Sequence, residues 1–222
     1  MSATLTQIDI DWTDFEGAGR QTRQYLRDLA ADKSRLREMV LAVQDDPKLL
    51  GMCERRQLFD CIVLHDAESG SRLEVHVSTG QRVDHPHDHC FSFSSFILCG
   101  GYDHTWYKPA RPRDEQDGDG ATPEHGAQLR SDEGEPATQQ ADLVPYVTRF
   151  EQPGSCYSIH HSVIHATATA DDTVSLFLRG PQEKDATTMQ DSADGTPQRE
   201  NKPMSVDYYR DLCAKLGHLE II

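Results

Sequence analysis

Three histidines at alternate positions constrain this chain more than any other feature of its sequence. His85, His87 and His89 are two residues apart, and in an extended segment residues at that spacing lie on one face, where their imidazoles can converge on a metal ion. The apolar run Phe91–Cys99 follows and ends at Gly100. We therefore predict that the histidines lie on, or lead into, a buried strand that is closed by a glycine turn.

Segments with apolar residues at every second position recur on both sides of this stretch. Residues 61–65 and 73–77 alternate in this way, and the turn residues Glu68–Ser71 between them predict a hairpin. Tyr102–Tyr107 alternates as another strand, and Leu143–Phe150 and Thr173–Arg179 also read as strands. Many short strands at this spacing predict a mainly β fold, an antiparallel β-barrel or double-sheet roll, in which distant side chains meet in one interior.

Helical periodicity is confined to the two ends of the chain. Over Gly19–Val43 apolar residues recur at intervals of three and four, which predicts one or two amphipathic helices, and a short helix is expected over Leu49–Leu58. Near the C-terminus the pattern predicts a helix over Ser205–Leu216 with Ser205 as its cap. The predicted division is an N-terminal helical layer at 1–58, a barrel at 59–181, and a C-terminal loop and helix at 182–222.

Residues 108–142 differ in composition from the rest of the predicted barrel. They are rich in Pro, Gly, Asp and Glu and contain almost no large apolar side chains, which predicts a long exposed insert. Its acidic residues lack the Asp-x-Asp-x-Asp-Gly loop with a closing Glu that calcium sites of the helix-loop-helix type use. We expect a solvated loop and no calcium site of that type.

Length, charge and cysteine spacing limit the size of the core, the kinds of partner and the cellular compartment that we expect. At 222 residues and 36% hydrophobic content the chain can bury one full-sized core. Its 22 Lys and Arg against 37 Asp and Glu give a formal charge of −15, which argues against nucleic acid or an anionic membrane as a partner. The first 20 residues show no signal-peptide pattern, and the six cysteines are scattered without CxxC spacing, so we expect a reduced, cytoplasmic protein.

A second stretch, Pro153–Ala166, can supply a third imidazole to a site that contains His87 and His89. It carries three candidates for this role: His160, His161 and His165. His85 shares the parity of the first pair but precedes Pro86, and we expect it at the strand mouth or behind the ligands.

The arrangement of the two stretches resembles the two-motif signature of the cupin superfamily. His87-x-His89 leads to Gly100 at the interval that the first cupin motif has, and a later hairpin containing Pro-Gly carries a further histidine. The resemblance covers roughly residues 59–181. It implies a β-barrel, a bound divalent metal and, in most members, an enzymatic activity.

Within the superfamily, the pattern looks most like thiol dioxygenases of the cysteine dioxygenase type. Like them, the chain has a His-Asp-His pair and lacks the glutamate that many cupins place after the second histidine, and the usual Asn of the second motif is also absent. The matching positions are His87, Asp88, His89, Tyr157 and His165. The resemblance thus implies His87, His89 and His165 as metal ligands, and it would place the cysteine of that family's Cys–Tyr crosslink near Ser94.

Three neutral imidazoles leave a divalent ion its full charge and at least two open positions. That donor set suits Fe(II) binding both an organic ligand and O₂, and it also suits Zn, Ni, Mn or Cu. Unless a bulge intervenes, three further residues share the parity of the ligands and make the interior apolar: Phe91, Phe93 and Ile97. Asp88 and Cys90 have the opposite parity and are expected to face out of the barrel.

The candidates for substrate contact and catalysis are Tyr157, His104 and Arg179, with Arg72 as a further candidate. An arginine at the end of a barrel strand can hold a carboxylate bidentately, and the alternative for either arginine is a surface ion pair.

The predicted function is a mononuclear non-heme Fe(II) dioxygenase that acts on a small thiol- or carboxylate-bearing molecule and uses O₂. The alternatives are a metal-dependent lyase, isomerase or hydrolase, in which the ion is a Lewis acid, and a non-catalytic cupin that binds a small ligand. Exposed edge strands would allow the barrel to associate as a homodimer.

Overall fold

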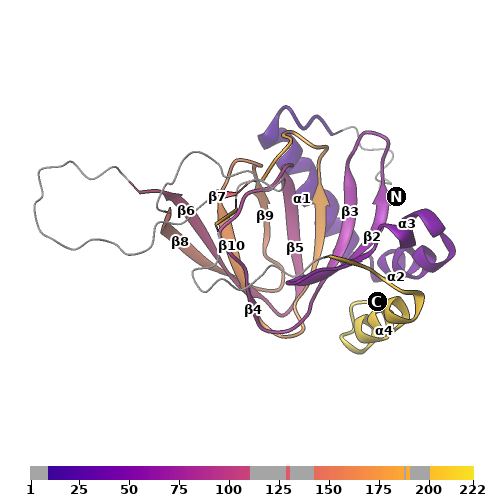
Figure 1. The fold of residues 1–222 in the computed structure, drawn as a ribbon. Helices are drawn as coiled ribbons and strands as arrows, with labels where there is room; N and C mark the ends of the chain where they lie inside the picture. Colours follow the sequence, from indigo (N-terminus) through magenta and orange to yellow (C-terminus); the bar gives the residue numbers. More distant parts are fainter. Residues whose placement is uncertain (1–9, 111–128, 131–142, 188, 191–200) are drawn as a thin grey trace, which may run out of the picture.

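Two antiparallel sheets form the body of the protein in the computed structural model (Figure 1). The structure describes residues 10–110, 129–130, 143–187, 189–190 and 201–222. The larger, seven-stranded sheet has the order β13 (Lys202–Pro203), β1 (Glu54–Arg55), β2 (Phe59–Asp66), β3 (Arg72–Ser78), β11 (Val174–Arg179), β5 (Phe93–Cys99) and β9 (Cys156–Ile159). The four-stranded sheet has the order β4 (Arg82–Val83), β10 (His165–Thr169), β6 (Tyr102–Pro109) and β8 (Leu143–Glu151).

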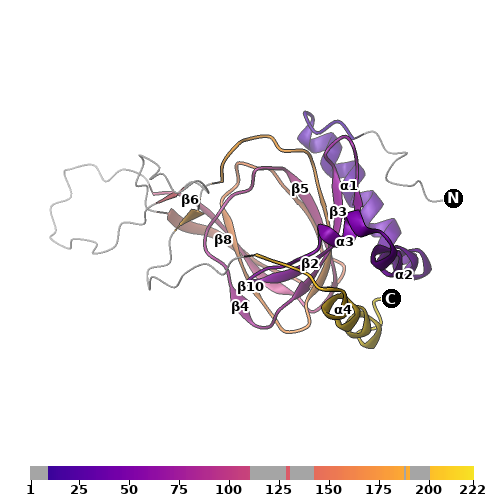
Figure 2. The same ribbon diagram turned by 45° about the vertical axis from the view of Figure 1, so that its right-hand side comes forward.

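The strands of the two sheets surround a common interior, which Figure 2 shows nearly end-on. The predicted hairpin is present as β2 and β3, and the other predicted strand segments lie in β6, β8 and β11. A short pair, β7 (Leu129–Arg130) and β12 (Met189–Gln190), adds a third sheet. The prediction of a mainly β, double-sheet fold with flanking helices is therefore confirmed.

The N-terminal helices pack against the outer face of the larger sheet. They are α1 (Phe15–Ala31), α2 (Lys33–Ala42), the 3₁₀ helix η2 (Val43–Asp45) and α3 (Pro47–Gly51). Helix α1 begins after Asp14, whose carboxylate accepts a hydrogen bond from the Gly17 amide at 3.0 Å. It lies along β5 and β9, where the Thr22 and Ser94 hydroxyls are 2.6 Å apart.

The short helix predicted over Leu49–Leu58 is wrong in its extent. Helix α3 ends at Gly51, and β1 begins at Glu54. Strand β1 pairs on one side with β2 and on the other with β13. The partner β13 is about 150 residues further along the chain, so local periodicity could not reveal the strand.

Helix α4 (Val206–His218) lies near the C-terminus, where a helix was predicted. The Ser205 hydroxyl caps it and accepts from the Tyr208 amide at 3.3 Å. The larger hydrophobic core lies between the seven-stranded sheet and the helices and includes Leu26, Leu29, Val40, Val75, Leu176, Tyr209 and Leu216. A smaller cluster lies inside the barrel and includes Phe93, Ile97, Tyr102, Tyr157, Ile159 and Phe177.

Most of the predicted acidic insert, at 111–128 and 131–142, lies outside the described residues. Its first residues continue β6 as far as Pro109. Within the described part of the chain, no helix combines the length and apolar character needed to cross a membrane.

Candidate metal centre

The structure brings together the three histidines that the sequence predicted as metal ligands. His165 is the first residue of β10, and His87 forms an isolated antiparallel bridge with it through two backbone hydrogen bonds of 2.9 and 2.8 Å. His89 follows two residues later, ahead of β5. Ring nitrogens of the three side chains lie within 4.8 Å of one another, and the Nε2 atoms of His89 and His165 are 2.9 Å apart.

The histidine stretch connects the two sheets and leads into strand β5. Val83 pairs with Ala168, and His87 pairs with His165. The segment from Val83 to His87 is therefore one residue longer than the segment from His165 to Ala168 that it pairs with. The extra residue is a bulge at His85–Pro86, because the proline cannot donate a hydrogen bond to the ladder. The apolar run predicted as a strand begins at Phe91, whereas strand β5 begins at Phe93.

Two of the three candidate ligands, His87 and His165, have a partner for the second ring nitrogen. The Nδ1 atom of His87 is 2.8 Å from the backbone carbonyl oxygen of His85 and 3.3 Å from Asp84 Oδ2. If that nitrogen carries the proton, Nε2 is left as the donor toward a metal. His85 thus contacts the His87 ring through its backbone carbonyl.

His104 plays the corresponding part for His165. Its Nε2 lies 2.7 Å from His165 Nδ1, and its Nδ1 lies 3.7 Å from Glu151 Oε1. The His104 and Glu151 side chains are almost completely inaccessible to solvent. His104 was predicted to contact substrate, but the structure places it behind His165, where it can fix the orientation and tautomer of that ring.

Burial keeps the clustered imidazoles in the form that binds metals. It lowers the pKa of His89 and of His165 well below the usual value, and the charge of the neighbouring His87 lowers both further. Neutral imidazoles offer a lone pair at neutral pH, so the donor set fits a divalent transition metal.

A cavity of about 270 Å³ opens beside the three histidines. Its apolar wall comprises Leu58, Phe59, Phe91, Phe93 and Phe177. The expected apolar interior is thus present, although Ile97 is buried behind it in the smaller core. Tyr157 also lines the cavity and shares a short hydrogen bond with the Tyr102 hydroxyl, and burial raises the pKa of Tyr157 well above its usual value.

The two predicted arginines do not line this cavity. Arg179 lies over the Phe91 ring at 4.5 Å, and its Nε is 3.7 Å from Glu74 Oε1. Arg72 forms an ion pair with Asp66 at 3.0 Å. Among the described arginines and lysines, Arg56 lines the cavity, and the sequence analysis did not single it out.

A His–Glu pair on β3 also borders the cavity. His76 lines it, and its Nε2 is 2.8 Å from a carboxylate oxygen of Glu74, a side chain that is almost fully buried. The His76 ring stacks between Phe177 and Phe59, with centroid distances of 4.5 and 5.6 Å. Glu74 and His76 are two positions apart on β3. Residues at that spacing lie on one face of a strand, so the sequence could have revealed the pair.

Cys61 completes a second group of potential ligands with Glu74 and His76. Its thiol donates to Glu74 at 3.1 Å. Burial and the charge of Glu74 raise the pKa of this thiol well above its usual value.

The alternative third ligands lie elsewhere. His160 and His161 form a separate group with Glu183, in which His161 Nδ1 is 2.8 Å from Glu183 Oε2. Asp88, expected to face outward, does not line the cavity, but it is buried and pairs with Lys184 at 2.6 Å. Ser94, at the position of the crosslinking cysteine in the resembled family, faces α1 through the Thr22 hydroxyl.

No protein-family model matches this chain, and no curated protein matches it. Among solved structures, a cupin superfamily protein from Desulfitobacterium hafniense DCB-2 is similar with a TM-score of 0.35 at 11% identity, over 58% of this chain and 82% of the other. The DMSP lyase DddQ from Ruegeria pomeroyi DSS-3 has a TM-score of 0.35 at 16% identity, over 60% and 51% of the two chains. Hydroquinone 1,2-dioxygenase from Sphingomonas sp. TTNP3 has a TM-score of 0.37 at 9% identity, over 57% and 68%.

Proposed function

We propose that this protein is a metal-dependent enzyme of the cupin type, an Fe(II) dioxygenase that acts on a small organic acid. The observation that carries the proposal is the convergence of ring nitrogens from His87, His89 and His165 within 4.8 Å at the wall of an aromatic cavity. His87, His89 and His165 would hold the ion. Fe(II), when bound, supplies the electrons that O₂ activation needs.

Other side chains of the cavity support the choice of substrate. Arg56 is the cation in its wall, and a guanidinium recognises a carboxylate through paired N–H donors. The aromatic wall excludes water from the remainder of a bound molecule. A volume of about 270 Å³ limits that molecule to a small one.

The His76–Glu74 pair supplies a proton carrier. Glu74 fixes the ring through Nε2, which leaves Nδ1 to hold or accept a proton from a bound substrate. This same pair favours a second candidate function, a metal-dependent lyase or isomerase, in which removal of a substrate proton is the central step.

Metal analysis and oxygen consumption together test the proposal. Protein loaded anaerobically with Fe(II) should retain about one ion per chain, and a panel of small thiols and carboxylic acids should contain one that induces O₂ uptake. Product formation without O₂ uptake would select the lyase or isomerase. Failure to retain either iron or zinc after anaerobic loading would exclude all of these functions.

A further inference from the structure

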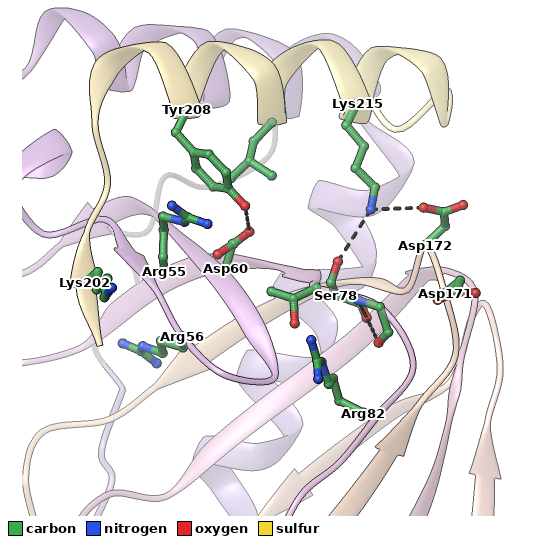
Figure 3. A pocket seen from close by; sticks show the side chains of 13 residues that line it. Arg55, Arg56, Asp60, Ser78, Arg82, Asp171, Asp172, Lys202, Tyr208 and Lys215 are labelled. Carbon is green, nitrogen blue, oxygen red and sulfur yellow. Dashed lines mark hydrogen bonds and ion pairs between the residues drawn. The ribbon is translucent and has the colours of Figure 1, made fainter. Parts of the chain in front are cut away.

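A second hollow, of about 540 Å³, lies under helix α4 where the edges of the two sheets meet (Figure 3). Tyr208 and Lys215 reach into it from α4, and Arg82 comes from β4. Arg55 comes from β1 and Lys202 from β13. Arg56 lines both this hollow and the metal cavity, and it is the one residue common to the two among those described.

The hollow is positively charged in an acidic protein. Five cationic side chains line it against three acidic ones, Asp60, Asp171 and Asp172, while the whole chain has a formal charge of −15. Two of these acids have partners within the hollow. Asp172 pairs with Lys215 at 3.0 Å, and Asp60 accepts a hydrogen bond from the Tyr208 hydroxyl at 2.6 Å.

Two of the cations are held side by side. Arg55 and Lys202 are direct cross-strand partners in the pairing of β1 with β13, and like charges in that position repel each other. The Arg55 guanidinium carbon lies 3.9 Å from the centroid of the Tyr208 ring, which holds it in place. Among the residues that the structure describes, no acid forms an ion pair with Arg55, Arg82 or Lys202.

We propose that this hollow binds the phosphate group of a small phosphorylated molecule. A dianion between Arg55, Lys202 and Arg82 would remove the repulsion between the first two, and guanidinium groups match phosphate oxygens through paired donors. All three side chains are exposed and accessible to a ligand from solution. The volume exceeds what inorganic phosphate alone fills, so the ligand carries a polar organic part as well.

Calorimetric titration of the full chain at constant ionic strength tests this site, with inorganic phosphate and glycerol 3-phosphate as probes. We expect saturable binding, tighter for glycerol 3-phosphate. Arg82→Gln and Lys202→Gln should each weaken it by about tenfold, because each removes one charge-assisted hydrogen bond. The matched control is Arg210→Gln on α4, whose guanidinium pairs with Asp207 and does not line the hollow.

Binding that does not saturate, or that Arg210→Gln weakens as much as Arg82→Gln does, would overturn the proposal. If one variant fails to fold, the other still decides the question. His165→Ala should bind glycerol 3-phosphate with unchanged affinity. The proposal of an anion site and the proposal of a metal centre are therefore tested independently.

Discussion

At the scale of single residues, the proposed metal ligands give the most direct prediction. Replacing His87, His89 or His165 by Ala should lower metal occupancy strongly, because two imidazoles hold a divalent ion too weakly to resist chelation. His161→Ala should retain the metal, since His161 lies in the group with Glu183. Elemental analysis after dialysis against a weak chelator measures both results. Loss of metal from His161→Ala with retention in His165→Ala would mean that the third ligand is misplaced.

The ionised Glu74 side chain is expected to stabilise the fold by an amount that depends on pH. Burial alone would raise the pKa of Glu74, but hydrogen bonding and charge from His76 and the charge of Arg56 outweigh burial and lower it from 4.5 to about 2. A carboxylate with a lowered pKa stabilises the fold above its unfolded value of 4.5, and this contribution is lost as the pH falls toward about 2. Its full size is on the order of 3 kcal/mol.

Urea unfolding of the wild-type protein and of Glu74→Gln at several pH values measures this contribution. The difference in free energy of unfolding should be constant above about pH 5 and should shrink steadily below it. A difference that stays the same down to pH 3 would show that the charge of Glu74 is not what stabilises the fold.

At the scale of elements, a chain of hydroxyls joins helix α1 to the larger sheet. Ser94 Oγ lies 2.6 Å from both Thr22 Oγ1 and Ser158 Oγ. Ser94→Ala should lower the free energy of unfolding by about 1–3 kcal/mol, because it removes two hydrogen bonds from a largely buried network. Thr148→Ala is the control, because its hydroxyl pairs with Thr105 at an exposed position. Equal, small effects of the two changes would contradict the prediction.

The sequence predicted the elements whose patterns are local and missed those that depend on distant partners. Short segments that contain apolar, β-branched and aromatic residues between turn signals predicted β2, β3, β6, β8 and β11. Strand β1 was not predicted, because its partner β13 lies far along the chain. The bulge at His85–Pro86 could be suspected from the proline, but its position depends on the pairing with β10.

The same reasoning applies to the candidate site. The three histidines were found because of their spacing and the resemblance. His104 could not be assigned a position behind His165, since this depends on how β6 pairs with β10. Glu151 approaches His104 because β8 lies on the other side of β6.

At the scale of the whole molecule, the proposed metal centre would join the two sheets. His165 belongs to the four-stranded sheet, whereas His89 leads directly into β5 of the seven-stranded sheet. An ion bound by both histidines is a crosslink that exists only in the folded chain, so it must stabilise the native state relative to the unfolded one.

Metal loading should therefore raise the melting temperature. Free metal at about 100 times its dissociation constant adds about 2.7 kcal/mol to the free energy of unfolding, which corresponds to a rise of about 5–10 °C for a chain of this size. Scanning calorimetry of metal-free and Zn-loaded protein measures the shift. His165→Ala should lose the shift and His161→Ala should keep it. If His165→Ala were still stabilised by zinc to the full extent, the ion would bind elsewhere and the two sheets would not be joined by it.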